Sequence, residues 1–217
     1  MKKLNVLSKI VNHGIVAVVR GDSPQQAIEI SDACIKGKLY GVEITFTVND
    51  ADQVIKQLVD KYQNNKDVVI GAGTVLDPYT ARIAILAGAE FIVSPTFDKA
   101  TAKICNMYQI PYMPGCLTIT EMREALEYGV DIIKLFPGNG FGASFLKAVK
   151  APLPQVNIMP TGGVSLDNIK DWISNGAVAV GVGGNLIAPA KDGDFEKITK
   201  IAEEYVKKVE EARGALL

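Results

Sequence analysis

The sequence predicts a (β/α)8 barrel of the TIM-barrel class, an α/β fold, with a short helix before the first strand. Short apolar runs rich in β-branched residues recur eight times, and segments with helical periodicity separate them. The length of 217 residues, of which 48% are apolar, suffices for one core and is short for two ordinary domains. We therefore expect one barrel domain over residues 1–217. The eight candidate strands are residues 15–19, 40–45, 68–70, 91–93, 112–113, 131–136, 156–159 and 178–182.

Several of the segments between these strands begin with recognisable helix starts. Ser23 and Asp77 each precede a proline, the order expected for an N-cap residue followed by the first helical position. Gln26 stands where a capping box with Ser23 requires a glutamine, and Thr118 with Glu121 predicts a second capping box. These starts fit helices that follow parallel strands.

The C-terminal segment predicts a closing helix. Between residues 195 and 209, apolar side chains recur at spacings of three and four, with charged residues on the opposite face. A doubly wound α/β sheet is the rival architecture for such a chain. We disfavour it because no GxGxxG fingerprint opens a helix in the first βα unit.

The composition disfavours several classes of function. Lys and Arg number 23 against 24 for Asp and Glu, so no global field attracts nucleic acid or an anionic membrane. No apolar stretch reaches the roughly 18–20 residues that span a bilayer. The single histidine, His13, cannot form a His-rich metal site, and three cysteines without a CxxC pair and no signal-peptide pattern predict a reducing cytoplasm. We expect no nucleic-acid partner, no membrane partner and no metal.

The residues at the ends of the candidate strands are unusually polar or small. In a barrel of this class, function gathers at the C-terminal ends of the strands. In chain order, these ends carry Arg20, Glu43, Thr45, Thr47, Gly71 to Thr74, Ser94, Pro95, Thr96, Pro114, Gly115, Lys134, Phe136, Thr161, Gly162, Gly163, Gly183, Gly184 and Asn185. We expect the functional site among them.

Lys134 is the candidate nucleophile. It lies within Asp-Ile-Ile-Lys-Leu-Phe-Pro and is the one lysine well inside a candidate strand. An ammonium in such surroundings loses hydration, which favours the neutral amine that can attack a carbonyl. The alternative is a lysine whose head reaches the rim or pairs with a carboxylate.

Glu43 is the candidate proton carrier. Its neighbours in Gly-Val-Glu-Ile-Thr are apolar or small, and a buried carboxylate without compensation is costly. With no histidine in a strand, Glu43 is the best group for moving protons at a lysine imine. A structural ion pair with Lys134 or Arg20 is the alternative, and the two roles are compatible.

Two glycine pairs indicate a phosphate site. The segments 161–163 and 183–184 offer backbone N–H groups without obstructing side chains, after the two strands that often form a phosphate site in barrels. The alternative is that the glycines only permit tight turns. Cys105 and Cys116 are expected to be packing residues, because neither has a histidine nearby in the sequence.

In order, six motifs resemble the class I aldolases that cleave 2-keto-3-deoxy-6-phosphogluconate (KDPG) and 4-hydroxy-2-oxoglutarate (KHG). They are GVEIT at 41–45, GAGTVL at 71–76, IVSP at 92–95, PGCLT at 114–118, IKLFP at 133–137 and PTGGV at 160–164. The resemblance covers nearly the whole chain. It implies a metal-independent lyase without a cofactor that acts on a 2-keto acid sugar phosphate, in a homotrimer.

The resemblance also implies roles for the site residues. Lys134 would be the Schiff-base lysine and Glu43 the general acid and base. Thr74 would contact the pyruvate half of the substrate, and Thr161 would lie near the aldehyde. The substrate-binding set of Arg20, Thr47, Thr74, Pro95, Phe136, Thr161, Gly162, Gly163, Gly184 and Asn185 follows, with Gly162, Gly163 and Gly184 near the phosphate.

Two positions depart from the family pattern. Thr47 stands where the phosphogluconate enzymes carry an arginine for the pyruvate carboxylate, and Asn185 stands where they carry a serine. Arg20 and residues 141–143 also resemble the related phosphogalactonate aldolases, so that activity is an alternative. We expect Arg20 to bind the carboxylate in place of the missing arginine, with the phosphate as its other possible partner. An isomerase or epimerase barrel and a non-catalytic binding relative are the remaining alternatives.

Overall fold

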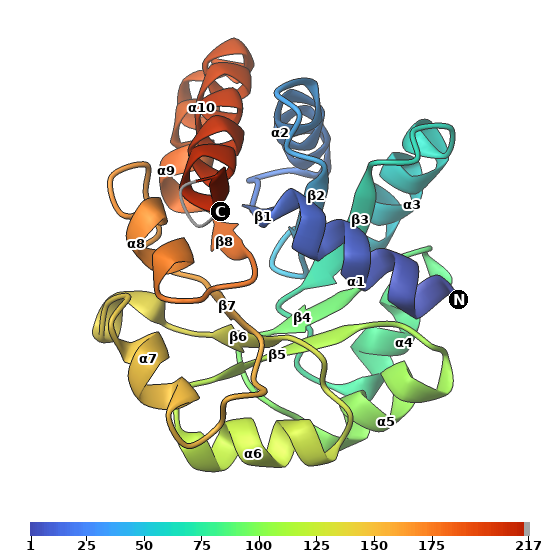
Figure 1. Cartoon of the computed structure of the whole chain (residues 1–217). Helices are drawn as coiled ribbons and strands as arrows, with labels where there is room; N and C mark the ends of the chain where they lie inside the picture. Colours follow the sequence, from blue (N-terminus) through green and yellow to red (C-terminus); the bar gives the residue numbers. More distant parts are fainter. Residues whose placement is uncertain (215–217) are drawn as a thin grey trace.

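Eight parallel strands form a closed barrel surrounded by helices in the computed structural model, which describes residues 1–214 (Figure 1). The strand order is β7-β6-β5-β4-β3-β2-β1-β8. The ring closes between β8 and β7, where the Val178 N–H donates to the Ile158 carbonyl at 3.0 Å and Thr161 bridges Gly181. The predicted (β/α)8 fold is therefore confirmed.

All eight candidate strands are present. They are β1 Ile15–Val19, β2 Gly41–Thr45, β3 Val69–Gly73, β4 Ile92–Ser94, β5 Tyr112–Cys116, β6 Ile133–Leu135, β7 Ile158–Pro160 and β8 Val180–Val182. Two of them continue into residues that we expected to follow the strand. Gly73 pairs with Thr45 and Gly115 pairs with Lys134, because the parallel ladders extend to the barrel rim.

Helices follow the strands and cover the outside of the barrel, and one further helix precedes the first strand. They are α1 Lys2–His13, α2 Pro24–Lys36, α3 Ala51–Tyr62, α4 Pro78–Leu86, α5 Lys99–Met107, α6 Ile119–Glu127, α7 Phe145–Lys150, α8 Ile169–Ser174, α9 Gly184–Ile187 and α10 Phe195–Gly214, with 3-10 turns η1 Gly138–Gly140 and η2 Ala188–Asp192. No helix in residues 1–214 combines the length and apolar character that crossing a membrane requires.

The expected helix starts are present, with one difference. The Ser23 hydroxyl accepts from the Gln26 N–H at 3.1 Å, and Thr118 with Glu121 forms the capping box. The Gln26 side chain, however, does not complete a capping box with Ser23. Its Oε1 accepts from the Asp22 N–H at 2.7 Å and its Nε2 donates to the Ala190 carbonyl at 3.1 Å. Gln26 therefore joins α2 to η2 because the closing turn of the barrel packs beside it.

The apolar residues divide into two cores. The larger core lies between the strands and the outer helices. The smaller core contains Val16, Val69, Val93 and other strand residues together with Val6 and Ile10 of α1. Helix α1 crosses one end of the barrel (Figure 1) and its two buried side chains close that end with apolar groups. The C-terminal ends of the strands are left as the open face, where barrels of this class place their sites.

Candidate active site

Lys134 on β6 and Glu43 on β2 meet inside the barrel. The Nζ–Oε1 distance is 3.7 Å, and the two side chains are 6% and 1% exposed. Among the ion pairs of residues 1–214, it is the one with both side chains buried. The structure thus brings the predicted nucleophile and the predicted proton carrier together, although they are 91 positions apart in the sequence.

A glycine on the adjacent strand β3 makes room for the Glu43 carboxylate. A Cβ atom added at Gly73 on β3 would collide with the Glu43 carboxylate. Gly115 on β5 pairs with Lys134, and a Cβ there would collide with the Pro95 carbonyl. Any larger residue at position 73 would therefore have to displace the carboxylate that faces Lys134.

Burial raises the pKa of the Glu43 carboxyl above its ordinary value, and the positive charges of Lys134 and Arg20 oppose this rise. In the described chain neither carboxylate oxygen of Glu43 has a hydrogen-bond partner. A carboxylate without donors and with a raised pKa is a stronger base than an exposed glutamate. Its surroundings therefore suit a group that accepts and returns a proton.

The aromatic ring of Phe136 lies beside the amine. Lys134 Nζ is 5.1 Å from the ring centroid. Phe136 also lines a cavity of about 180 Å³ at the open face, together with Arg20, Thr161, Gly162, Gly163, Gly184 and Asn185. Seven residues of the expected substrate-binding set thus surround one space, and one of them, Phe136, also lies beside the Lys134 amine.

The backbone conformation also favours glycine at two positions of this cavity. Gly162 and Gly163 have φ angles of 90° and 75°, in the left-handed region that favours glycine. The Thr161 carbonyl accepts from the Gly138 N–H at 2.8 Å, which ties the turn after β7 to the turn after β6. The Thr161 hydroxyl oxygen is buried and has no hydrogen-bond partner among residues 1–214.

Thr74 follows β3 and Pro95 follows β4. In the barrel, these two strands and β5 lie between β2, which carries Glu43, and β6, which carries Lys134. Neither residue lines the cavity of about 180 Å³. Thr74 has a φ angle of 55°, and a non-glycine residue in this region costs roughly 1–2 kcal/mol. Lys38, Asp50 and Gln109 adopt the same region, so this angle describes the turn after β3 and does not by itself mark Thr74 as functional.

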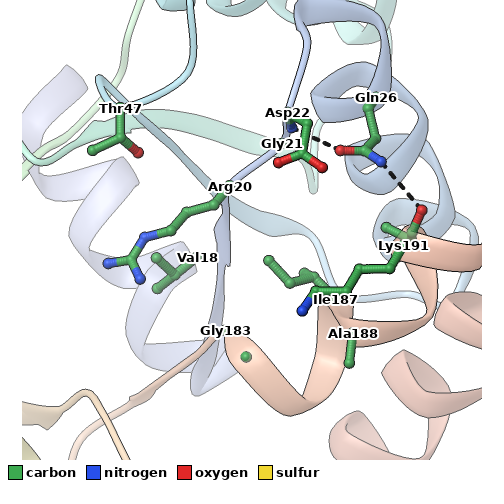
Figure 2. Close-up of a pocket in the computed structure, with 12 residues that line it drawn as sticks. Val18, Arg20, Gly21, Asp22, Gln26, Thr47, Gly183, Ile187, Ala188 and Lys191 are labelled. Carbon is green, nitrogen blue, oxygen red and sulfur yellow. Dashed lines mark hydrogen bonds between the residues drawn. The ribbon is translucent and has the colours of Figure 1, made fainter.

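Figure 2 shows a second, larger cavity of about 570 Å³ at this face. Both cavities are lined by Val18, Arg20, Gly183 and Gly184. Of the expected residues, Thr47 lines only the larger one. Arg20 has no ion-pair partner in residues 1–214, and Figure 2 shows its guanidinium directed toward the side of the cavity where Thr47 lies.

The hydroxyl proton of Thr47 is already engaged. The Thr45 hydroxyl donates to the Val19 carbonyl at 3.1 Å, because a carbonyl can only accept. The 2.7 Å contact between the hydroxyls of Thr45 and Thr47 must therefore use the proton of Thr47. Toward a ligand, Thr47 then presents only lone pairs, so in this arrangement it cannot donate to a carboxylate. Arg20 is left as the cation at this side of the site.

The cysteines lie in the packed interior. Burial raises the pKa of the Cys105 and Cys116 thiols to about 12, which removes the thiolate at neutral pH. The three cysteines are free and buried. Within residues 1–214, no three His, Cys, Asp or Glu side chains are grouped so that they could hold a metal ion.

Comparison with known proteins identifies the family. The family model described as KDPG and KHG aldolase matches residues 6–201. The chain belongs to this aldolase family. Its relatives include a 2-dehydro-3-deoxy-phosphogluconate aldolase of Treponema pallidum (strain Nichols), 32% identical over 194 residues that cover 88% of this chain and 90% of the relative.

Two further comparisons bear on the chemistry of this aldolase. A 2-dehydro-3-deoxy-6-phosphogalactonate aldolase of Escherichia coli (strain K12) is 33% identical over 199 residues, covering 91% of this chain and 95% of the relative. The crystal structure of a Legionella pneumophila KDPG aldolase, with pyruvate captured at low pH as a covalent carbinolamine intermediate, superimposes with a TM-score of 0.83. It is 25% identical, covering 94% of this chain and 97% of that chain.

Two features of the aldolase site were not predicted from the sequence. The contact between Gly73 and the Glu43 side chain depends on the pairing of β2 with β3, and a single glycine in a GAGT segment does not indicate it. Lys191 lines the larger cavity from η2, nine residues beyond the end of β8, so it is not among the residues at the strand ends.

Removing the charge of Glu43 should stabilise the aldolase at high pH. Because the Glu43 pKa is higher in the folded protein than in the unfolded chain, its contribution to stability is complete below the ordinary glutamate value. This contribution is lost as the pH rises through the raised value. Glu43→Gln should therefore have a larger free energy of unfolding than wild type at pH 8, and the difference should vanish near pH 4.

Urea denaturation at both pH values measures this difference. The exposed Glu203 supplies the control Glu203→Gln, which should show no such pH-dependent difference. A Glu43→Gln variant less stable than wild type at pH 8 would mean that the ion pair with Lys134 outweighs the cost of burial.

Proposed function

We propose that this chain cleaves KDPG to pyruvate and glyceraldehyde 3-phosphate, and KHG to pyruvate and glyoxylate, through a Schiff base at Lys134. The observation that carries the proposal is the buried approach of Lys134 Nζ to Glu43 Oε1 at 3.7 Å. An amine and a carboxylate that share an apolar interior are the two groups that imine formation and aldol cleavage require. This chemistry needs no metal.

The covalent steps begin at the amine. Neutral Lys134 adds to the C2 ketone of the substrate, and the resulting carbinolamine loses water to give a protonated imine. The imine accepts the electron pair of the C3–C4 bond as that bond breaks, which leaves an enamine and releases the aldehyde. Protonation of C3 and hydrolysis of the imine then release pyruvate and restore the amine.

Glu43 moves the protons of these steps. Its carboxylate takes the proton of the C4 hydroxyl, directly or through a water molecule, when the C3–C4 bond breaks. The raised pKa of Glu43 supports this role, because a general base works best when its pKa lies close to the working pH. Gly73 supports it geometrically by leaving the carboxylate room beside Lys134.

The remaining residues of the set bind the two ends of the substrate. Backbone N–H groups at Gly162, Gly163 and Gly184, with the Asn185 amide, bind the phosphate in the cavity of about 180 Å³. The pyruvate half lies against Thr74, Pro95 and Phe136, and Thr161 lies near the aldehyde. The buried Thr161 hydroxyl without a partner in residues 1–214 supports a contact that the substrate completes.

The second candidate substrate is 2-keto-3-deoxy-6-phosphogalactonate, which differs from KDPG in the stereochemistry of a hydroxyl group. Arg20 favours it, since the resemblance to those enzymes rests on this residue and on segment 141–143. The ratio of kcat/KM for the two phosphorylated 2-keto-3-deoxy acids decides between them. A higher kcat/KM for 2-keto-3-deoxy-6-phosphogalactonate than for KDPG would make it the main substrate.

We also propose a homotrimer that works in the cytoplasm. Support for self-association comes from a row of exposed apolar side chains on and beside α4, formed by Leu76, Tyr79, Ile83 and Leu86. Exposed apolar patches of this kind mark protein interfaces. The free, buried cysteines fit a reducing compartment.

Lys134→Met should abolish both cleavage and adduct formation. Methionine fills a similar volume without an amine, so the barrel should keep its fold. Borohydride reduction in the presence of pyruvate should add a reduced pyruvate group to wild type and none to Lys134→Met, as measured by intact-protein mass. Lys147→Met, at an exposed lysine on α7, is the control and should behave as wild type. A reduced adduct that persists in folded Lys134→Met would overturn the assignment.

Arg20→Ala should weaken pyruvate binding by about 10- to 100-fold. The Arg20 guanidinium takes the place of the arginine that the related enzymes carry at the position of Thr47. A charge-assisted hydrogen bond is worth roughly 1.5–3 kcal/mol. Inhibition constants for pyruvate in wild type and variant measure this loss, with the exposed Arg123→Ala as control. Unchanged pyruvate affinity combined with a lost preference for phosphorylated substrate would assign Arg20 to the phosphate instead.

A further inference from the structure

The turn between β4 and α5, residues 95–98, lies at the level of the reacting amine. A Cβ atom added at Gly115 on β5 would collide with the Pro95 carbonyl group, so the main chain of Pro95 fills the space that a side chain there would take. Gly115 pairs with Lys134 of β6. Pro95, Gly115 and Lys134 therefore lie at one level of the barrel, on or directly after three neighbouring strands.

The main chain of Pro95 reaches the inside of the barrel. Alternate residues of a strand point to opposite faces. Gly115 and Lys134 each come two positions after a residue of the smaller core, Met113 and Ile132 respectively, so both face the barrel interior. The Pro95 carbonyl group, which a Cβ at Gly115 would meet, is therefore part of the interior wall beside Lys134.

Tyr112 holds this turn from the outer face of the barrel. Its side chain is 4% exposed and belongs to the larger core, between the strands and the helices. The Tyr112 hydroxyl contacts the Ser94 hydroxyl at 2.8 Å and the Thr96 carbonyl at 3.2 Å. It also accepts from the Asp98 N–H at 3.2 Å, and the Ser94 hydroxyl donates to the Thr96 carbonyl. One hydroxyl group thus binds the residues on both sides of Pro95.

The hydroxyl of Tyr112 keeps its proton at neutral pH. Burial raises the pKa of Tyr112 to about 12, so the group can donate as well as accept. The far end of the turn is fixed separately, because the Asp98 carboxylate accepts from the Thr101 N–H at 2.6 Å and caps α5. Without the Tyr112 hydroxyl, the Asp98 N–H loses this acceptor and the Ser94 hydroxyl loses one of its two partners.

We propose that Tyr112 is a positioning residue of the aldolase, whose hydroxyl keeps the β4–α5 turn in the arrangement that holds Pro95 against Gly115 at the level of Lys134. This inference rests on the proposed function, in which the pyruvate half of the substrate lies against Pro95. The hydrogen bonds of the Tyr112 side chain go to the β4–α5 segment, whereas the turns after β7 and β8 line the cavity of about 180 Å³. The effect of Tyr112 is therefore on the pyruvate end of the site.

Tyr112→Phe tests this role, because it removes the hydroxyl and keeps the ring. Borohydride trapping at increasing pyruvate concentrations gives the concentration that half-saturates adduct formation, and this value should rise three- to tenfold in the variant. The KM for D-glyceraldehyde 3-phosphate, measured in condensation at saturating pyruvate, should stay within twofold of wild type. A general loss of structure would change both quantities.

Two further variants complete the test. Ser94→Ala removes a partner of the same hydroxyl and should raise the half-saturating pyruvate concentration by a similar factor. The double variant should stay within twofold of the larger single effect, because both changes act on one turn. Tyr62→Phe, at the end of α3, removes a hydroxyl that donates to the Asp32 carboxylate at 2.7 Å and should bind pyruvate as wild type does.

The outcomes separate this inference from the proposed function. A rise of less than threefold in the half-saturating pyruvate concentration of Tyr112→Phe overturns the inference, as does an equal rise in the KM for the aldehyde. Should Tyr112→Phe fail to fold, Ser94→Ala decides by the same criteria. In these cases wild type still forms the adduct. Wild type that forms no reduced pyruvate adduct overturns the aldolase function itself.

Discussion

The buried approach of an ammonium to a carboxylate at the centre of the barrel is the constraint on which the site depends. Two charges in an apolar interior are costly unless they compensate each other. Lys134 and Glu43 do so across 3.7 Å, yet the Glu43 pKa is still raised. The pair is therefore suited to proton transfer, because Glu43 takes up a proton more readily than a solvated glutamate does.

The rest of the barrel is arranged around this pair. Below it, α1 and the strand residues of the smaller core close the barrel with apolar groups, which keeps water away from the amine. Beside it, Gly73 provides the space that the Glu43 side chain needs, and Gly115 lets the backbone of Pro95 approach β5. Above it, the turns after β7 and β8 supply the cavities. Packing, glycine placement and chain topology thus all contribute to the surroundings of the Lys134 amine and the Glu43 carboxylate.

The sequence predicts the fold well, and it singles out Lys134 and Glu43 as the candidate reacting groups, because both inferences depend on local patterns. A lysine or a glutamate inside an apolar strand is visible in a single segment, and the strand-end rule locates most of the rim. What it does not predict depends on tertiary contacts. The space for Glu43 comes from Gly73 on the neighbouring strand, the loss of the Thr47 donor comes from its contact with Thr45, and Gln26 forms a bridge to Ala190 in place of a capping box. Lys191 enters the site from a turn well beyond any strand end.

The central claim, that activity requires the Glu43 carboxylate beside Lys134, is tested most directly with Gly73→Ala. The added methyl group should displace the carboxylate and lower kcat for KDPG cleavage by about 10²–10⁴-fold, the usual worth of general acid–base catalysis, while pyruvate trapping at Lys134 persists in the folded variant. Gly140→Ala, at a position with open space around it, is the control. Wild-type turnover in Gly73→Ala would contradict the claim.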